Sequence, residues 1–390
     1  MKILQIINSH ALQDGGAQRL ALELHRAYRA RGHEAHLLSL MRSPCEETGT
    51  HSLGFATPYR TQVWPRLRRF LHQPRWNDVE ILHVHLFPAQ IWVPLTRPKN
   101  LSKARLVTTE HNTFNRRRAT RLGRLCDALT LRAYERIICI SPATSEALSQ
   151  WQPQIQNKLV TIPNGIDLGR FENATARHQE NSPLIIIAVG RIAQQKNYET
   201  AIRAIAQLKA TNFEFWIVGQ DEMNGEMQRL CVELGQNERI RFLGYQADIP
   251  ALLMRSDIFL LTSKWEGFGL AVAEAMAAGL PTIASDVPGV REVVGADDGG
   301  ANEKGESAND ESVNEKGGFL VDPNSPADVA ARLEELLQNP ELRENMGRRA
   351  QIRAARFDIA GTIENHLALY HEVLAIPATR SQSESNREIR

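Results

Sequence analysis

Cysteine and long apolar runs are scarce in this chain of 390 residues. Its four cysteines, Cys45, Cys126, Cys139 and Cys231, have neither CxxC nor metal-ligand spacing, which argues against a disulfide framework and a cysteine-based metal site. The longest strand-like apolar run covers residues 184–189 and is far shorter than the roughly 20 residues that a membrane-spanning helix needs. These absences favour a reduced, cytoplasmic protein.

Several signal and motif patterns are also missing. The apolar start of the chain is similar to a signal peptide, but Asn8, Ser9 and His10 interrupt it too early, so a first β-strand is expected there. The segment after this strand is neither a G-x-G-x-x-G fingerprint nor a Walker A loop. An Asp-x-Asp motif is absent, and no nucleic-acid-binding motif accompanies the basic residues. We therefore expect no cofactor, no bound metal and no nucleic-acid partner.

The formal net charge of +1 hides an uneven distribution. Residues 1–163 hold 23 Lys and Arg against 11 Asp and Glu, whereas the remainder holds 23 against 34. Much of the positive charge lies near Trp64, Phe70 and Phe114, in two clusters: Arg66, Arg68 and Arg69, and Arg116, Arg117, Arg118, Arg121 and Arg124. Such a basic and aromatic surface suits anionic lipid headgroups or a phosphorylated acceptor. Solvated helix faces are the alternative.

Strand-like runs alternate with amphipathic helical segments in two successive series, which predicts an α/β fold of two Rossmann-like domains. The first series of strands is expected at 2–7, 34–40, 80–85, 104–109, 136–140 and 158–162, with a helix over about 16–31. The second is expected at 184–189, 213–218, 239–243, 257–261, 281–284 and 318–321. The predicted domains are 1–165 and 166–355, joined near residues 163–167.

Two segments lack the apolar residues that a folded core requires. Residues 297–317 carry seven acids against two lysines and almost no large apolar side chain, so they cannot offset the entropy lost on ordering. We expect a mobile acidic insertion there. For the same reason, we expect the tail at 377–390 to be disordered.

Glycine and histidine follow strands of the first series. Gly15 and Gly16 come after the first strand and begin a helix, where free N–H groups and the helix dipole favour an anion, although a tight structural turn is the alternative. His111 follows a later strand at an edge where open α/β sheets bind ligands, although a structural histidine is the more common meaning of a single histidine. His83 and His85 alternate on a strand, which favours local packing or hydrogen bonding.

In the second series, two cations accompany strand-end glycines. Gly190 and Arg191 end one strand, and Lys196 lies just before the next helix, so that two fixed charges and a close backbone are available to a diphosphate. Gly219 repeats the strand-end glycine one unit later. A solvated surface position is the alternative for either cation alone.

Two glutamates flank a glycine-rich helix start. The N–H groups of Phe268, Gly269 and Leu270 are expected to converge on one spot, with Glu266 and Glu274 on either side. A carboxylate repels a phosphate, so we expect these carboxylates to accept hydrogen bonds from the hydroxyl groups of ribose and hexose. The alternative for Glu274 is that it caps its own helix. The segment from 190 to 274 is therefore interpreted as a site for a sugar joined to a diphosphate.

These motifs together resemble the family-4 retaining glycosyltransferases of GT-B fold, also described as glycosyl transferases group 1, to about residue 374. The resemblance implies that Arg191 and Lys196 bind the donor diphosphate and that Glu274 holds the ribose. It implies that Glu266, with the backbone of 268–270, contacts the transferred sugar and phosphate. A last helix near 358–374 is expected to cross back onto the N-terminal domain.

From the N-terminal domain, the resemblance implies that Gly16 closes over the diphosphate and that His111 approaches the sugar at the reacting centre. Arg116, Arg117, Arg118 and Arg121 are expected to contact the acceptor or an anionic membrane surface. The implied reaction moves a hexose-type sugar, with UDP favoured over GDP, to a lipid-linked or phosphorylated glycan. The protein is then expected at the inner face of the cytoplasmic membrane, in the biosynthesis of lipopolysaccharide or another envelope or extracellular polysaccharide.

The implied mechanism is a metal-independent front-face transfer, because both glutamates are assigned to donor hydroxyls and no second acidic pair is evident. A nucleotide-sugar epimerase or hydrolase of the same fold is an alternative. A nicotinamide-dependent enzyme would need an acid at the end of the second strand, and residues 37–40 supply none. A non-catalytic binding protein also remains open, because fold alone does not establish activity.

Overall fold

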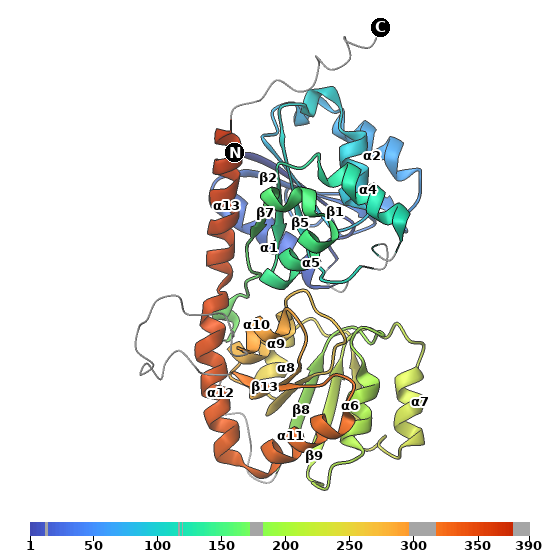
Figure 1. Cartoon of the computed structure of the whole chain (residues 1–390), viewed down its shortest axis with the longest axis vertical. Coiled ribbons are helices and arrows are strands. Elements are labelled where there is room, and N and C mark those ends of the chain that lie inside the picture. Colours follow the sequence, from blue (N-terminus) through green and yellow to red (C-terminus); the bar gives the residue numbers. More distant parts are fainter. Residues whose placement is uncertain (12–14, 116–117, 119, 172–181, 296–316, 377–390) are drawn as a thin grey trace.

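The computed structural model contains two parallel β-sheets, each covered by helices on both faces (Figure 1). It describes residues 1–11, 15–115, 118, 120–171, 182–295 and 317–376. The predicted α/β fold with two Rossmann-like units is confirmed. The tail at 377–390 and all of the expected insertion except Gly317 lie outside the described residues.

The N-terminal unit is built on seven strands in the order β3-β2-β1-β4-β5-β6-β7. The strands are β1 (Lys2–Ile7), β2 (Glu34–Met41), β3 (Thr50–Phe55), β4 (Ile81–His85), β5 (Arg105–Glu110), β6 (Arg136–Cys139) and β7 (Leu159–Thr161). The helices before α6 are α1 (Gly16–Ala30), α2 (Val63–Leu71), α3 (Ala89–Thr96), α4 (Arg121–Leu131) and α5 (Pro142–Trp151). Helix α1 covers one face, and α2 to α5 share a core with the other.

The C-terminal unit is built on six strands in the order β10-β9-β8-β11-β12-β13. The strands are β8 (Leu184–Val189), β9 (Phe213–Val218), β10 (Ile240–Gly244), β11 (Ile258–Leu261), β12 (Thr282–Ser285) and β13 (Gly318–Val321). The helices are α6 (Tyr198–Ile205), α7 (Glu226–Glu233), α8 (Ile249–Met254), α9 (Leu270–Ala277), α10 (Val290–Val294), α11 (Pro326–Gln338) and α12 (Pro340–Ala354). Helices α6, α7 and α11 cover one face, and α8, α9, α10 and α12 cover the other.

Strand β3 was not predicted, because its sequence differs from that of the inner strands. Inner parallel strands are buried on both faces and read as continuous apolar runs. Thr50–Phe55 pairs only with β2 at the sheet edge and keeps half-exposed polar residues. The other predicted strands exist, and their ends agree with the prediction or differ from it by one residue.

The last helix, α13 (Ile359–Ala375), runs from the C-terminal unit along the N-terminal one (Figure 1). It shares a core with α1 and β1, where the hydroxyl groups of Tyr28 and Tyr370 lie 3.2 Å apart. At its start, the backbone of Ile166 pairs with Phe357 and Ile359. The chain passes between the two units near residue 166 and again near residue 358. These two segments are thus hydrogen-bonded to each other. Within the described residues, no helix combines the length and apolar character needed to cross a bilayer.

Candidate functional site

A cleft of about 450 Å³ separates the two units. Residues that directly follow β4, β5, β8 and β9 line it together with residues 15–19 at the start of α1, so the carboxyl ends of strands from both sheets face the same space. In each sheet, the strand order reverses at the first strand of the unit, β1 or β8, and ligands of open α/β sheets bind at this point. The volume is typical of a small-molecule site.

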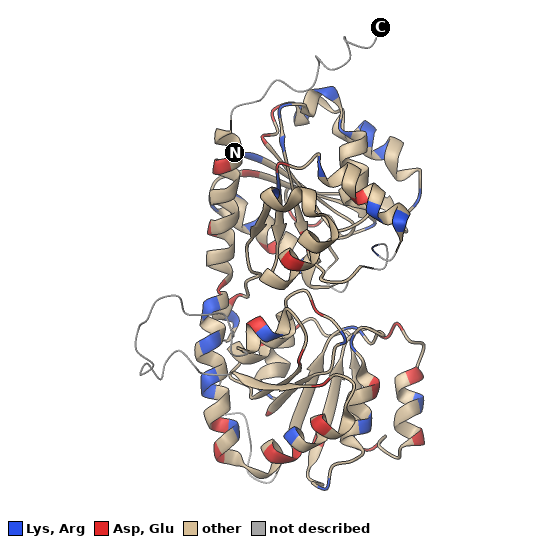
Figure 2. Ribbon diagram, viewed as in Figure 1, with Lys and Arg blue, Asp and Glu red and all other residues tan. Residues whose placement is uncertain are grey.

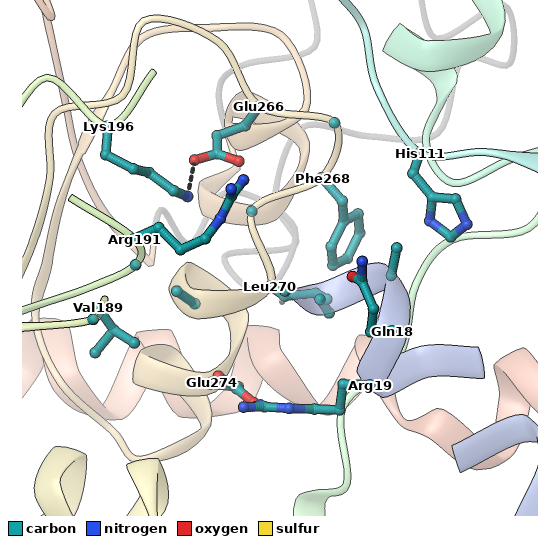
Figure 3. A pocket seen from close by; sticks show the side chains of 18 of the residues that line it. Gln18, Arg19, His111, Val189, Arg191, Lys196, Glu266, Phe268, Leu270 and Glu274 are labelled. Atoms are coloured by element: carbon teal, nitrogen blue, oxygen red, sulfur yellow. Dashed lines mark hydrogen bonds and ion pairs between the residues drawn. The ribbon is translucent and has the colours of Figure 1, made fainter. Parts of the chain in front are cut away.

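Lys196 and Glu266 form an ion pair at the wall of the cleft that belongs to the C-terminal unit (Figure 3). The Lys196 Nζ lies 2.6 Å from Oε1 of Glu266, and the Ser263 hydroxyl donates to the same oxygen at 2.7 Å. Both partners are largely buried, with side-chain exposures of 18% and 10%. The lysine therefore presents a cation of fixed position, and Oε1 of Glu266 is already bound by Lys196 and Ser263.

Glycine is required at two strand ends because the backbone and the Lys196 stem come so close. A Cβ on Gly190 would lie 2.9 Å from Lys196 Cε, and a Cβ on Gly219 would lie 2.0 Å from the Gly190 carbonyl oxygen. Both glycines also have φ values above +150°, which other residues rarely adopt. These two glycines let the lysine side chain lie across the carboxyl ends of β8 and β9.

Arg191 lines the same cleft but is more exposed than Lys196. Its Nη1 lies 2.7 Å from Oε1 of Glu222, and both side chains are about 40% exposed. An exposed ion pair contributes little to stability, so the guanidinium can exchange this partner for a ligand at small cost.

The segment from Phe268 to Leu270 leads into α9 at the edge of the cleft. Gly269 adopts the left-handed φ of 94° that begins the helix. The first turn of a helix has N–H groups without partners inside the helix, and it carries a partial positive charge. Phe268, Gly269 and Leu270 all line the cleft, as do Glu266 and Glu274.

Glu274 is paired with Arg19 of α1, across the cleft (Figure 3). The carboxylate is 9% exposed and the arginine 27%. The alternative of a helix cap does not apply, since this side chain binds a residue of the opposite unit. Arg19 was missed as a site residue: the sequence places it one turn into a helix and gives no signal for a partner 255 residues away.

Gly15 and Gly16 lie where α1 meets the cleft. Gly15 is the N-cap of α1, with φ 138°, and a Cβ on Gly16 would lie 2.6 Å from a methyl carbon of Leu270. Gly16 therefore contacts the start of α9 directly.

His111 lies on the N-terminal side of the cleft, and the residue is 7% exposed (Figure 3). Burial lowers its pKa to about 3, so the ring is neutral near pH 7. Its Nε2 lies 3.3 Å from Nδ1 of His85, and its Nδ1 is buried with no protein partner among the described atoms. His83 and His85 are fully buried and hydrogen-bonded, as expected.

The two units touch at the backbone of Glu266 and Gly267. The Thr113 hydroxyl donates to the Glu266 carbonyl at 2.9 Å, and the Ser141 hydroxyl donates to the Gly267 carbonyl at 2.6 Å. A Cβ on Gly267 would lie only 2.1 Å from the His111 carbonyl oxygen. These contacts hold His111 and Glu266 on opposite sides of one closed junction.

Glu23 of α1 borders a smaller cavity next to the Arg19–Glu274 pair. Burial raises its pKa from the ordinary 4.5 to about 7, and Arg19 only partly offsets this effect. The folded state thus holds the proton more tightly than the unfolded state, so stability is lost as pH rises through this range.

We expect the free energy of unfolding to fall by up to about 3 kcal/mol between pH 4.5 and 7 on account of Glu23. Glu23→Gln should remove this part of the pH dependence and make the variant relatively more stable above pH 7. Urea unfolding of both proteins across this range measures the difference. Parallel pH profiles would contradict the assignment.

The predicted basic surface is only partly present in the described residues (Figure 2). Arg118 is 9% exposed and lies 2.8 Å from Glu110, so its predicted contact with a membrane or acceptor is corrected: the chain turns back and buries this guanidinium against the end of β5. Arg121 is exposed at the start of α4, whereas Arg116 and Arg117 lie outside the described residues.

The same helix shows an apolar face that the sequence analysis missed. Leu122, Leu125 and Leu129 are 71%, 57% and 63% exposed. Their spacing of three and four residues places them on one side of α4. The spacing is visible in the sequence, but it normally indicates a face turned to the core.

Two family models match adjoining parts of the chain. "Glycosyltransferase Family 4" matches residues 14–170, and "Glycosyl transferases group 1" matches residues 170–353. Together they extend across both units and the cleft.

The curated relatives include enzymes of polysaccharide assembly. The lipopolysaccharide core biosynthesis glycosyltransferase LpsD of Rhizobium meliloti is 26% identical over 88% of this chain and 91% of its own length. LpsE of the same organism is 29% identical over 44% of this chain and 51% of its own length. An Escherichia coli UDP-Gal:alpha-D-GlcNAc-diphosphoundecaprenol alpha-1,3-galactosyltransferase is 31% identical over 40% and 43%. The chain spans about half the length of the first curated relatives it matches.

Solved structures share the fold over nearly the whole chain. HepE of Anabaena, in complex with UDP and glucose, has a TM-score of 0.78 at 18% identity and covers 95% of this chain and 100% of its own. WaaG, a glycosyltransferase involved in lipopolysaccharide biosynthesis, has a TM-score of 0.71 at 16% identity, over 94% and 99%. At such identities the likeness shows the fold, with two units facing a central cleft.

Proposed function

The chain belongs to the GT-B glycosyltransferases of the family-4 type, and we propose that it transfers a hexose-type sugar from a nucleotide diphosphate to a glycan acceptor, with retention of configuration. The observation that carries the proposal is the cleft in which Lys196, Arg191 and the start of α9 lie at one wall. Two cations and a helix N-terminus in one place suit a diphosphate.

The donor is proposed to lie along the C-terminal wall. Its diphosphate binds Lys196 and Arg191, while the sugar approaches Glu266 and the backbone of 268–270. The ribose hydroxyls replace Arg19 as partners of Glu274, which keeps the carboxylate hydrogen-bonded after Arg19 is displaced. Tyr245 and Gln246 line the same cleft and are proposed to enclose the base.

We propose a front-face reaction. The bond between sugar C1 and the phosphate oxygen breaks while the acceptor oxygen attacks from the same face, and the leaving phosphate oxygen takes the acceptor proton. Lys196 and Arg191 stabilise the charge that grows on the diphosphate. A double displacement would need a free carboxylate as nucleophile, whereas Glu266 is bound to Lys196 and Ser263.

UDP is the favoured nucleotide, and a lipid-linked or phosphorylated glycan is the favoured acceptor. The first is supported by HepE, which was solved with UDP and glucose. The second is supported by relatives of lipopolysaccharide biosynthesis and by the excess of basic residues before residue 163.

Thermal unfolding with UDP-, GDP- and ADP-sugars tests the donor, and product analysis with and without a glycan acceptor tests the reaction. Transfer with an anomeric configuration equal to that of the donor supports the proposal. Release of an altered free sugar without acceptor would indicate an epimerase or hydrolase. Stabilisation without any turnover would indicate a binding protein.

We also propose that α4 and its neighbours dock on an anionic membrane surface. Helix α3 packs against both α2 and α4, and its residue Leu95 is also exposed. The exposed arginines of α2 and α4 are Arg66, Arg68, Arg69, Arg121 and Arg124. Leucines flanked by arginines suit the interface between acyl chains and anionic headgroups.

The double variant Leu122→Ser and Leu125→Ser should lower binding to phosphatidylglycerol-containing vesicles about 10-fold or more, because each leucine loses its burial in lipid. Co-sedimentation with vesicles measures the loss. Val232→Ser is a matched control, since Val232 is 68% exposed on α7 of the other unit. Equal binding by all three proteins would refute this docking surface.

A further inference from the structure

A chain of buried hydrogen bonds leads from β1 to His111. The Gln5 amide Nε2 donates to the Ala21 carbonyl at 3.4 Å, which directs Oε1 of Gln5 the other way. That Oε1 lies 3.2 Å from Nε2 of His85, and Nδ1 of His85 lies 3.3 Å from Nε2 of His111. Gln5 and His85 are completely buried. The strand order explains the arrangement, because β1, β4 and β5 are neighbours.

The partners determine which nitrogen of each ring carries the proton. Burial lowers the pKa of His85 well below its ordinary value and that of His111 to about 3, so each ring is neutral and has one N–H. Oε1 of Gln5 only accepts, so His85 donates from Nε2 and its Nδ1 is an acceptor. His111 must donate to that Nδ1 from Nε2. The Nδ1 of His111 is therefore an unprotonated acceptor.

This acceptor lacks a protein partner at the wall of the cleft. It is buried, and no described protein group donates to it. A buried acceptor without a partner raises the free energy of the ligand-free state, and a ligand hydroxyl would relieve this cost. The residue cannot withdraw easily, because its carbonyl oxygen is packed against Gly267.

We propose that Gln5 and His85 are positioning residues that hold His111 as a hydrogen-bond acceptor for a hydroxyl group of the transferred sugar. The inference rests on the proposed function for the identity of the ligand, but the proton arrangement belongs to the protein alone. Since the free nitrogen cannot donate, the subsite takes a sugar with a hydroxyl at this position and discriminates against a keto or deoxy sugar.

Nitrogen-15 NMR of histidine-labelled, ligand-free protein at pH 7 tests the proton arrangement, with the His111 signals assigned from their absence in His111→Asn. We expect His111 to carry its proton on Nε2. Gln5→Met should mix the two tautomers of His85 and His111. Gln90→Met is the matched control, because Gln90 is also buried but binds Thr108 and Thr109 instead. A proton on Nδ1 of ligand-free His111, or an equal response to both variants, would overturn the proposal.

Binding of UDP and UDP-glucose by His85 variants tests the effect on the sugar. His85→Leu removes the acceptor of the His111 proton and should weaken UDP-glucose about 10-fold while leaving UDP unchanged. His85→Asn keeps an acceptor oxygen near the Nδ1 position and should restore most of the affinity. Equal losses for UDP and UDP-glucose, or no rescue by asparagine, would mean that His85 has only a structural role. If neither probe binds the unmodified protein, the proposed donor fails, and the NMR result alone decides the inference.

Discussion

Replacing Lys196 by alanine should lower kcat by on the order of 10²-fold or more. Lys196 supplies a buried cation whose position is fixed by Glu266 and by its stem over Gly190. Negative charge grows on the diphosphate as the sugar leaves, so a fixed cation binds the transition state more tightly than the ground state. Steady-state turnover of the nucleotide sugar measures the loss, and unchanged kcat would refute the role of the lysine.

Two further variants separate the loss of the cation from its side effects. Lys196→Met keeps the apolar stem over Gly190, so a loss of kcat cannot be due to a cavity. Lys196→Met still leaves Glu266 buried without its counterion, which costs stability. Combining it with Glu266→Gln removes that unpaired charge and should restore thermal stability without restoring kcat. Lys264→Ala, at an exposed position nearby, is the control for a lysine outside the site.

Replacing Gly267 by alanine should lower kcat by about 10²-fold, because the added methyl group would push the two units apart. The added Cβ would lie 2.1 Å from the His111 carbonyl oxygen, which belongs to a backbone that cannot simply rotate away. The φ of Gly267 is not in the left-handed region, so the substitution does not strain its own loop. The contact between the two units must open, and His111 moves away from the wall of the cleft where the donor is proposed to bind. Such displacements cost catalysis more than binding.

Nucleotide binding distinguishes this separation of the two units from unfolding of the protein. UDP is proposed to bind mainly to the C-terminal unit, so calorimetry should give a similar Kd for Gly267→Ala and the unmodified protein. Gly361→Ala is the control, because a Cβ at Gly361 on α13 meets open space. Normal kcat for Gly267→Ala would show that the closed junction is not needed for the reaction. Loss of UDP affinity together with thermal stability would instead show a local folding defect.

The strands that position the site were predictable because burial on both faces leaves continuous apolar runs such as Leu184–Val189. The places of Gly190, Gly219 and Lys196 at the cleft were predictable for a related reason. These residues follow such apolar runs, and the carboxyl ends of parallel strands meet at one edge of the sheet. The burial of Arg118 was not predictable, because the sequence shows only that it is the last of three adjacent arginines. Its ion pair with Glu110 depends on how the chain turns after β5, which sequence spacing does not reveal.

The sequence by itself determined the two units, the cations and glycines at the C-terminal strand ends, and the family. These features are local: each depends on residues within one strand, turn or helix start. Only the tertiary structure decided that Arg19 pairs with Glu274, that Gly267 meets the His111 backbone, and that His85 and Gln5 lie behind His111. The physical reason is that these contacts join strands and units far apart in the chain, where the closure of the cleft and the strand order, rather than local preference, bring side chains together.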